Sequence, residues 1–419
     1  MRKYLLLAGV AACLISSCGK NETPVPDDPS KETPGTNPGN GNPATQKLLY
    51  ADPAFKAPTS FTSAHAFPQT DGKVIVDAYT TVNDQNVIKI YRLNTNGSLD
   101  ASFDIDGDRT WFIKSVAGIF VLADGKILLG GEFTVNGKSV GLVRLNNTGL
   151  LDKSYVSPFS LNGNNMVMGL QRVANGKVIV TGKYSLNSWD KTYIPSMLRL
   201  NSDGTIDASF SVSGEMVPRY NYAYHSVVPL TNGKILVAGR FLLGVDSDKR
   251  DYIVLLNDNG SIDYSFKFKL IPDASASILN VAVQSDGKIF IQGAFDQLTD
   301  PSIRDAVYRY GGVARLNSDG SLDQSFNSLS DLNGAILGMS TLSDNRLVTI
   351  ISTPSGQWNT IKDYIKLYGV NGEKDNSYSF QYGKSIINSL FRLSPDNFLL
   401  TGQIDVDGVK YPVIKLKKN

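Results

Sequence analysis

One phrase recurs along this chain, an Asp followed three residues later by Phe or Tyr. Its fullest form, Arg-Leu-Asn-Ser-Asp-Gly-Ser-Leu-Asp-Gln-Ser-Phe, spans 315–326, and six copies keep most of it. Such self-similarity constrains the architecture strongly, because each copy must form the same small unit. The seven pairs, spaced 48 to 60 residues apart, are Asp52/Phe55, Asp100/Phe103, Asp152/Tyr155, Asp207/Phe210, Asp263/Phe266, Asp323/Phe326 and Asp375/Tyr378.

A second element alternates with the first. Asp-Gly-Lys or Asn-Gly-Lys precedes a short apolar run, as in Asp124-Gly125-Lys126 before Ile127. Such dipeptides between extended runs indicate tight β-hairpins, and the Asn-x-x-Gly segment of each phrase predicts a second set of turns. Five copies are clear, and two degenerate ones follow at 344–346 and 395–397.

Each repeat therefore holds about four short, β-branched strands, a content that suits a propeller blade. The last repeat stops after its third strand, at Tyr411–Leu416, and the segment Lys47–Phe55 supplies the missing piece. Proteins avoid unpaired sheet edges. We therefore predict an all-β, seven-bladed β-propeller of four-stranded blades, closed by the N-terminal strand pairing with the last blade.

The phrases Asp-Gly-Lys-Ile-Leu-x-x-Gly-x-Phe and Arg-Leu-Asn-x-Asp-Gly-Ser-Leu-Asp-x-Ser-Phe resemble the delta-60 repeat family, a β-propeller domain of unknown function. The resemblance runs from about Leu48 to Asn419. It implies the fold and, since the family has no assigned activity, it implies no chemistry.

The segment ahead of the repeats predicts where the protein is located in the cell. Arg2-Lys3 is followed by the apolar run Leu5–Ile15 and then by Ser16-Ser17-Cys18, which resembles the signal of a bacterial lipoprotein. An ordinary secretory peptide is the alternative, but it needs no Cys at this place. We predict a signal peptide over 1–18, acylation (palmitate) of Cys18, a disordered Pro/Asn/Thr/Gly-rich tether over 19–46, and a propeller over 47–419. The expected location is the outer membrane, lipid-anchored and facing the cell surface.

Signatures of catalysis and of metal binding are weak. The chain has only two histidines, His65 and His225, and we interpret each as a solvated or packed side chain. Asp104, Asp106 and Asp108 form the densest acidic cluster, but they do not complete a calcium loop, so a polar turn is favoured over a metal site. A net charge of +2 without a basic stripe argues against nucleic acid. We expect no enzyme activity and no cofactor.

Residues that recur in every repeat are expected to hold turns and pack neighbouring blades, so function should lie in what does not recur. The Asp-Gly and Asn-x-x-Gly turns share one face, the repeated-turn face, and the variable loops emerge on the other, the variable-loop face. Aromatic side chains concentrate in those loops and predict a recognition surface, although several could instead fold inward. The candidate ligand-binding residues are Trp111, Trp189, Asp190, Tyr193, Arg219, Tyr220, Tyr222, Tyr224 and Trp358.

Three function classes remain. The leading hypothesis is a surface lipoprotein that captures a glycan or other nutrient for an outer-membrane transporter, as a monomer or as part of the transporter complex. The second is a protein-interaction or adhesion scaffold with a surface protein partner. The third is a propeller hydrolase or lyase, which would need convergent acids or a His on one face.

Overall fold

The fold is seen in a computed structural model of the 419-residue chain, which divides into two compact units, Met1–Thr45 and Gln46–Asn419. All the described residues belong to the second unit. The structure describes residues 49–60, 63–82, 85–107, 110–160, 166–173, 176–183, 185–186, 197–212, 216–217, 223–243, 250–268, 271–272, 278–293, 295, 297–299, 307–309, 312–326, 329, 335–354, 361–375, 385–394 and 396–418.

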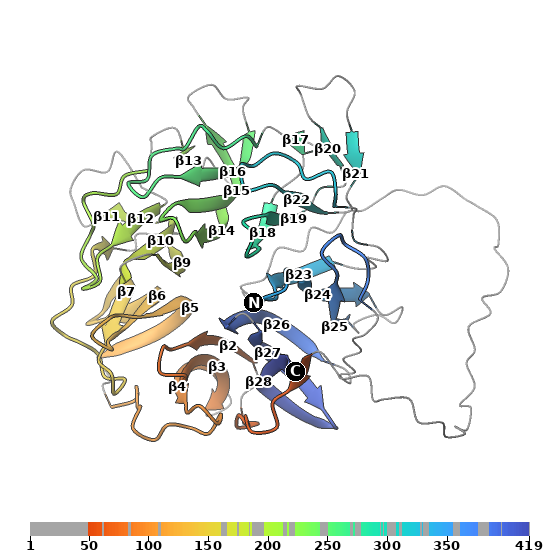
Figure 1. Cartoon of the computed structure of the whole chain (residues 1–419). Coiled ribbons are helices and arrows are strands. Elements are labelled where there is room, and N and C mark those ends of the chain that lie inside the picture. The colour runs from red at the N-terminus through yellow and green to blue at the C-terminus, as the bar shows by residue number, and fades with distance from the viewer. Residues whose placement is uncertain are drawn as a thin grey trace, which may run out of the picture. The chain divides into compact units, whose positions relative to one another are not determined.

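Every regular element among these residues is a β-strand, and each repeat contributes one antiparallel sheet (Figure 1). The strands are, repeat by repeat, β2 (Ser63–Pro68), β3 (Val74–Val82) and β4 (Gln85–Leu93); β5 (Trp111–Val121), β6 (Ile127–Val135) and β7 (Lys138–Leu145); β9 (Met166–Arg172), β10 (Val178–Lys183) and β12 (Met197–Leu200); β14 (Ala223–Pro229), β15 (Ile235–Leu243) and β16 (Arg250–Leu256); β18 (Ile278–Val283), β19 (Ile289–Gly293) and β22 (Val313–Leu316); β23 (Ala335–Thr341), β24 (Leu347–Pro354) and β25 (Ile361–Tyr368); β26 (Ile386–Ser394), β27 (Asn397–Val406) and β28 (Val409–Lys418).

The predicted fourth strand of each repeat is reduced to a single β-bridge in the first six sheets. Leu93, for example, bridges to Leu99, and Leu200 bridges to Ile206. The reason lies in the Asp that follows each bridge. Its Oδ1 accepts the backbone N–H of the residue two positions later, as Asp207 does from Ser209 at 3.0 Å, and this contact bends the chain into a turn. In each of these six repeats the sequence predicted a fourth strand after the third, and the structure has a single bridge in its place.

The last sheet is completed by the N-terminal segment, as the sequence predicted. Strand β1 (Leu49–Ala51) pairs antiparallel with β28, with Leu49 opposite Lys418 and Ala51 opposite Leu416. The Asp52 N–H then donates to the Lys415 carbonyl at 2.7 Å. The start and the end of the described chain thus lie in one sheet.

Hydrophobic clusters join the sheets face to face. Among the described residues every cluster but one takes side chains from two consecutive sheets; one, for instance, combines Ile179 of β10 with Val237 of β15. Another combines Val76 of the first sheet with Leu399 and Val413 of the last. Because the middle strands are covered on both faces, runs such as Ile127-Leu128-Leu129 are fully buried and apolar.

Short ribbons form between the sheets, in segments that the sequence placed on the variable-loop face. Strand β8 (Phe159–Ser160) pairs with β11 (Ser185–Leu186), and β13 (Met216–Val217) pairs with the end of β15. In the fifth repeat, β17 (Ile271–Pro272), β20 (Gln297–Thr299) and β21 (Val307–Arg309) make a small sheet of their own.

Candidate functional site

The recurring phrase builds an ionic clamp between consecutive repeats. In the third repeat, the Asp207 Oδ2 accepts hydrogen bonds from the Arg199 Nε at 2.6 Å and from the Lys177 Nζ at 2.8 Å. The guanidinium of Arg199 lies over the Phe210 ring at 4.8 Å. Its Nη1 donates to the Asp258 carbonyl at 2.5 Å, in the Asn-x-x-Gly turn of the next repeat. One arginine thus links a carboxylate, an aromatic ring and a neighbouring repeat.

The same arrangement recurs in four described repeats, which explains why the phrase repeats and confirms its structural role. The arginines Arg92, Arg144, Arg199 and Arg315 bind Asp100, Asp152, Asp207 and Asp323, and each reaches the next turn at the carbonyl of Asn147, Asp203, Asp258 and Val370 respectively. The lysines Lys73, Lys126, Lys177 and Lys288 bind the same four carboxylates. Burial raises the pKa of these four carboxyl groups. The hydrogen bonds from lysine and serine outweigh that effect and hold each pKa well below its usual range.

The fourth repeat breaks the pattern, because Leu255 occupies the place of the arginine. The equivalence is set by the backbone. The Asp263 N–H donates to the Leu255 carbonyl at 2.7 Å, as the Asp207 N–H donates to the Arg199 carbonyl at 2.9 Å. The lysine remains, and the Lys234 Nζ binds the Asp263 Oδ2 at 2.5 Å. This hydrogen bond lowers the pKa of Asp263 to about 2.

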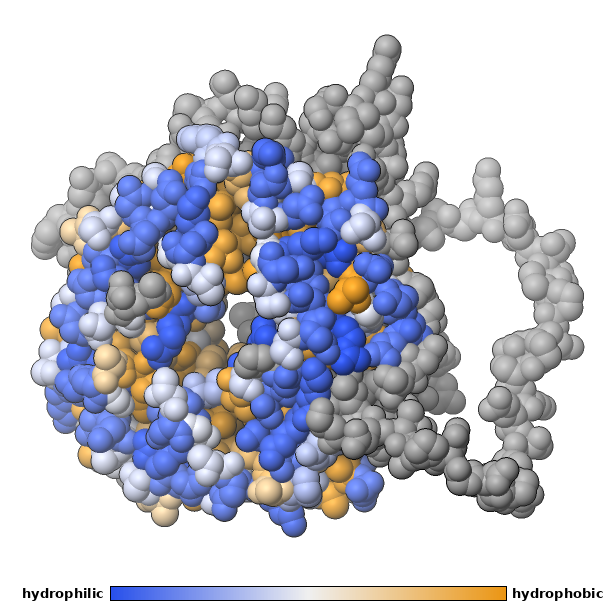
Figure 2. All heavy atoms as spheres, viewed as in Figure 1, coloured by the Kyte–Doolittle hydropathy of each residue, from blue (hydrophilic) through white to orange (hydrophobic). Residues whose placement is uncertain are grey.

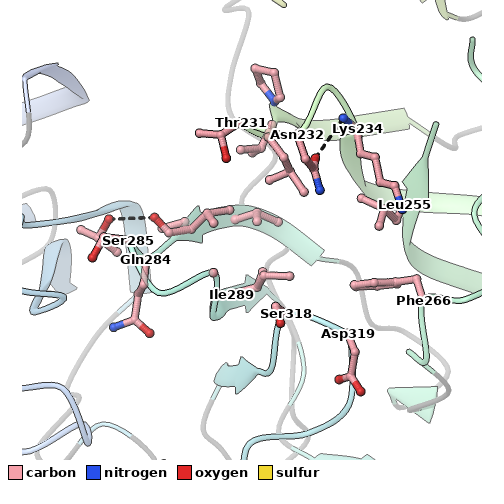
Figure 3. Close-up of a pocket in the computed structure, with 18 of the residues that line it drawn as sticks. Thr231, Asn232, Lys234, Leu255, Phe266, Gln284, Ser285, Ile289, Ser318 and Asp319 are labelled. Carbon is pink, nitrogen blue, oxygen red and sulfur yellow. Dashed lines mark hydrogen bonds between the residues drawn. The ribbon is translucent and has the colours of Figure 1, made fainter. Parts of the chain in front are cut away.

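A cavity of about 750 Å³ lies at this altered junction, on the repeated-turn face. It is lined by Leu255, Asp263, Ser265 and Phe266 of the fourth repeat, by turn residues of the fifth, including Asp319, and by residues of β23 and β26 in the sixth and seventh repeats. Figure 3 shows Leu255, Phe266 and Asp319 at one end of the cavity. Figure 2 shows the molecule hollowed between the sheets, with hydrophobic side chains around the hollow.

The other end of the cavity carries further polar groups. Gln284 is only 4% exposed, its Nε2 donates to the Asn345 carbonyl at 2.6 Å, and its Oε1 has no hydrogen-bond partner in the described chain. Figure 3 places Gln284 opposite Phe266. Arg392 of β26 also lines the cavity, and its Nη1 donates to the Thr341 Oγ1 at 3.3 Å. A buried amide oxygen without a partner is costly, so a ligand group that donates to it would be stabilised.

Two of the aromatic residues proposed from the sequence lie inside the fold. Trp111, at the start of β5, is 5% exposed and packs against Phe133 with ring centroids 6.3 Å apart. Tyr224, in β14, is 9% exposed and belongs to the hydrophobic cluster between the third and fourth sheets. Both fit the alternative that the sequence left open, in which aromatic residues fold inward and cover the ends of the strands.

The remaining candidates lie outside the described residues. These are Cys18, Trp189, Asp190, Tyr193, Arg219, Tyr220, Tyr222 and Trp358. The predicted recognition surface on the variable-loop face therefore stays a prediction. No helix in the described part of the chain is long and apolar enough to cross a membrane.

The acidic cluster forms a turn with an ion pair. The Asp104 Oδ1 accepts the Asp106 N–H at 2.8 Å, and the Asp106 carboxylate pairs with Lys89 at 2.6 Å. Asp108 lies outside the described residues. Searched over the described positions, His, Cys, Asp and Glu make no group of three that could hold a metal ion.

His65 has a partner that the sequence did not reveal. Its Nδ1 lies 3.1 Å from the Oδ2 of Asp77, which is 5% exposed, and its backbone N–H donates to the Asp77 Oδ1 at 2.9 Å. The hydrogen bond to Asp77 raises the pKa of His65. Asp77 sits opposite His65 in the β2–β3 pairing, so only the strand register brings the two together.

Sequence reasoning missed the cavity because it attended to what recurs. The signal was nevertheless present: position 255 is Leu where four sister repeats have Arg, while Asp263, Ser265 and Phe266 are all retained. A repeat that keeps the acceptors and loses the donor can be found by aligning the copies with one another.

The family described as "Domain of unknown function (DUF5122) beta-propeller" matches five segments of the chain. They are residues 69–103, 122–155, 174–210, 230–266 and 284–326. Each segment ends on the aromatic residue of the recurring phrase. Among curated proteins, no sequence matches this chain.

Several solved structures resemble the chain at low sequence identity. YCF48 bound to a D1 peptide is 9% identical with a TM-score of 0.47, covering 89% of this chain and 97% of that one. Prolyl oligopeptidase B from Galerina marginata is 13% identical with a TM-score of 0.45, covering 84% of this chain and 48% of that one. A gluconolactonase from Xanthomonas campestris is 12% identical with a TM-score of 0.30, covering 88% and 98%. At these levels the likenesses assign no activity to this chain.

Proposed function

We propose, from the premise that its repeats are those of a β-propeller family of unknown function, that this chain is a non-catalytic binding protein. Its ligand is a small polar molecule, a glycan or other nutrient, held in the cavity between the fourth and fifth repeats. One observation carries the proposal: a cavity of about 750 Å³ whose buried Gln284 Oε1 has no partner among the described residues. Small-molecule sites are typically concavities of this size with a few convergent polar groups on an apolar lining.

The architecture that presents this cavity is a ring of seven blades, six of them with a bridge after the third strand and the seventh closed non-covalently by β1. The order of the hydrophobic clusters supports it, since every cluster joins neighbours in sequence except the one that joins the first sheet to the last. A ring held in this way keeps its cavity rigid, which lowers the entropic cost of binding.

The predicted lipid anchor adds a location to the proposal. Acylation of Cys18 and a tether over 19–46 would hold the propeller at the outer membrane, where a captured nutrient could pass to a transporter. Acyl chains contribute roughly 0.8 kcal/mol per buried CH₂ to membrane binding. Membrane fractionation of Cys18→Ala tests this part, because we expect the variant to be released and unacylated; a variant that stays membrane-bound in high salt would contradict it.

Binding in the cavity is tested with the purified full chain. Sugars, amino acids and their derivatives are screened by thermal shift, and each hit is titrated by calorimetry against wild type, Gln284→Met and Lys114→Gln. We expect Gln284→Met to weaken the hit at least about tenfold, since the unpartnered acceptor is removed. Lys114→Gln, an exposed change outside the cavity lining, should leave the affinity unchanged.

Two results would count against this function. Equal affinity in wild type and Gln284→Met would move the site elsewhere and favour the scaffold alternative on the variable-loop face. Chemical turnover of the bound ligand would contradict the non-catalytic assignment and favour the hydrolase or lyase alternative.

A further inference from the structure

The cavity after the fourth repeat lies where four other repeats place an arginine side chain; the sixth repeat also has a leucine at this position, Leu367, whose carbonyl accepts the Asp375 N–H at 3.0 Å. Four repeats place an arginine guanidinium between an Asp, a Ser, an aromatic ring and the next turn. The fourth repeat keeps every receiving group and supplies no guanidinium, because its residue is Leu255. We propose that this junction binds the guanidinium group of a ligand. The inference rests on the proposed binding function and names the ligand chemistry.

The carboxylate has room for a second cation. In each sister repeat the Oδ2 receives both a lysine and an arginine; the Asp207 Oδ2, for example, has the Lys177 Nζ at 2.8 Å and the Arg199 Nε at 2.6 Å. Among the described residues, the Asp263 Oδ2 receives a cation only from the Lys234 Nζ. The Asp263 carboxylate can therefore accept one more hydrogen bond from a cation. Such charge-assisted hydrogen bonds are among the stronger kinds.

The hydroxyl and the ring are also in place. Ser265 is held against the Asp263 Oδ1 by its N–H at 2.9 Å and its Oγ at 2.7 Å, as Ser209 is held by Asp207 at 3.0 and 2.6 Å. In the sister repeat, that Ser Oγ accepts from the arginine Nη2. The ring of Phe266 is part of the cavity wall, whereas the Phe210 ring is 7% exposed beneath its guanidinium. A planar cation over an aromatic face gains about 0.5 to 2 kcal/mol.

The next turn offers the last acceptor. In three of the four complete junctions the arginine Nη1 donates to the second residue of the following turn, as Arg199 does to Asp258. The second residue of the turn that follows the fourth repeat is Ser318, and it lines the cavity. Gly320 closes this turn at a φ of +86°, and its position leaves no room for a Cβ beside the Phe266 ring. The backbone φ of Gly320 equals that of Gly260, which closes the turn at the filled junction.

The backbone connection between the repeats is also the same, because the Lys267 N–H donates to the Asp319 carbonyl at 2.6 Å as the Ser211 N–H donates to the Asn259 carbonyl at 3.0 Å. The ion pair between the Lys267 Nζ and the Asp319 carboxylate, at 2.8 Å, further joins the fourth and fifth repeats from the outer side. The side chains of Lys267 and Asp319 are 65% and 43% exposed, unlike the 2% of Arg199. The junction is thus held together without filling its interior, which is what a binding site needs.

The rest of the cavity favours particular polar groups on the part of the ligand beyond the guanidinium. Beyond the guanidinium position lie the Gln284 Oε1, which needs a donor, and Arg392, which can pair with a carboxylate. An arginine amino acid and an arginine side chain within a peptide share the guanidinium and differ at this far end. Both sources are compared in the test.

The test titrates the purified full chain with four probes by calorimetry. The probes are L-arginine, L-citrulline, the peptide acetyl-Gly-Arg-Gly-amide and its citrulline counterpart. Citrulline keeps the shape and replaces the guanidinium by a neutral urea. We expect at least one arginine probe to bind and its citrulline partner to bind at least about tenfold more weakly. Preference for L-arginine identifies a free guanidino compound, preference for the peptide identifies an arginine side chain, and either supports the proposal.

Two variants locate the site. Leu255→Arg places a guanidinium where the other repeats have one and should abolish arginine binding while leaving the chain folded. Lys114→Gln, an exposed change outside the cavity lining, should bind arginine within about twofold of wild type. Arginine binding that survives in Leu255→Arg would overturn the proposal.

The outcomes also separate this proposal from the broader function. If neither arginine probe binds but another polar hit depends on Gln284, the cavity is a binding site and the guanidinium assignment is wrong. If arginine binds and Gln284→Met has no effect, the guanidinium assignment is supported. The proposal that the Gln284 amide contributes to binding is then wrong.

Discussion

The junctions before and after the fourth repeat differ in one side chain: an arginine fills the first, and the second contains a cavity. On the near side, Arg199 is 2% exposed and links Asp207, Phe210 and Asp258. On the far side, Leu255 is 7% exposed and packs in a hydrophobic cluster, and it lines the cavity. The backbones of the two junctions are built alike, so the difference between a clamp and a cavity lies in one residue.

The comparison teaches how a repeat protein can acquire a site. Every repeat must satisfy the same packing, so its recurring polar residues are already arranged to receive a cation. Losing the cation at one junction leaves a preorganised set of acceptors without disturbing the others, provided that another contact holds the neighbours together. Lys267 and Asp319 provide that contact here.

The largest expected effect concerns the pairing of β1 with β28, which joins the start of the described chain to its last sheet. Deleting 47–55 removes β1, the Asp52–Lys417 ion pair at 2.7 Å and the buried Phe55. Loss of a buried Phe alone costs about 3 to 5 kcal/mol, so the melting temperature should fall by many degrees. Truncation at Gln46 is the matched control and should change little. Equal melting of the two truncations would contradict closure by β1.

Arg199→Leu should turn the filled junction into a copy of the open one. The change leaves Asp207 with Lys177 alone and creates a hollow, so we expect a loss of roughly 3 kcal/mol in the free energy of unfolding. Urea unfolding measures it, with the exposed change Lys114→Gln as control. A loss below about 1 kcal/mol would mean that the clamp contributes little and that the two junctions differ only in shape.

Leu255→Arg is the reverse change and should be stabilising by about 1 kcal/mol, because it completes a set of contacts that the fold already accommodates elsewhere. Differential scanning calorimetry of this variant beside Leu255→Met measures the gain. Destabilisation by Leu255→Arg, with Leu255→Met near wild type, would show that the open junction cannot adopt the geometry of its sisters.

The smallest effect concerns an ion pair away from the clamps. The pKa of His65 is raised above 6.5 by Asp77, so the protonated form is favoured in the folded chain. The resulting stability is fully present below pH 6.5 and is lost as the pH rises through the folded value. His65→Gln should therefore lower stability more at pH 5.5 than at pH 8.5. The side chain is 43% exposed, so the difference should be small beside the junction effects.

Much of the fold followed from the sequence, for identifiable reasons. The spacing of the Asp/aromatic pairs and the Asp-Gly turns predicted repeated antiparallel sheets, and the missing last piece predicted the pairing of β1 with β28. The fourth strands were overestimated, because the Asp of each phrase caps the chain into a turn after one bridge. That capping depends on side-chain geometry that strand propensity does not contain.

The candidate binding residues were harder to predict from the sequence than the fold. Aromatic content marked Trp111 and Tyr224 as candidates, but content does not say which way a side chain faces, and both are buried in clusters between sheets. The cavity arose instead on the repeated-turn face, from an exception to the repeat rather than from a variable loop.

The sequence by itself determined the unit of this protein: which residues turn, which are buried, and which Asp, Arg and Lys recur to be paired. Only the tertiary structure decided what those units enclose. The side chains of a clamp come from positions eight to about sixty residues apart and from two repeats, as Arg199, Asp207 and Asp258 show. Whether a missing arginine leaves a packed gap or an open cavity depends on how closely the neighbouring sheets approach. That distance is set by the packing of the sheets against one another and by no single stretch of the chain.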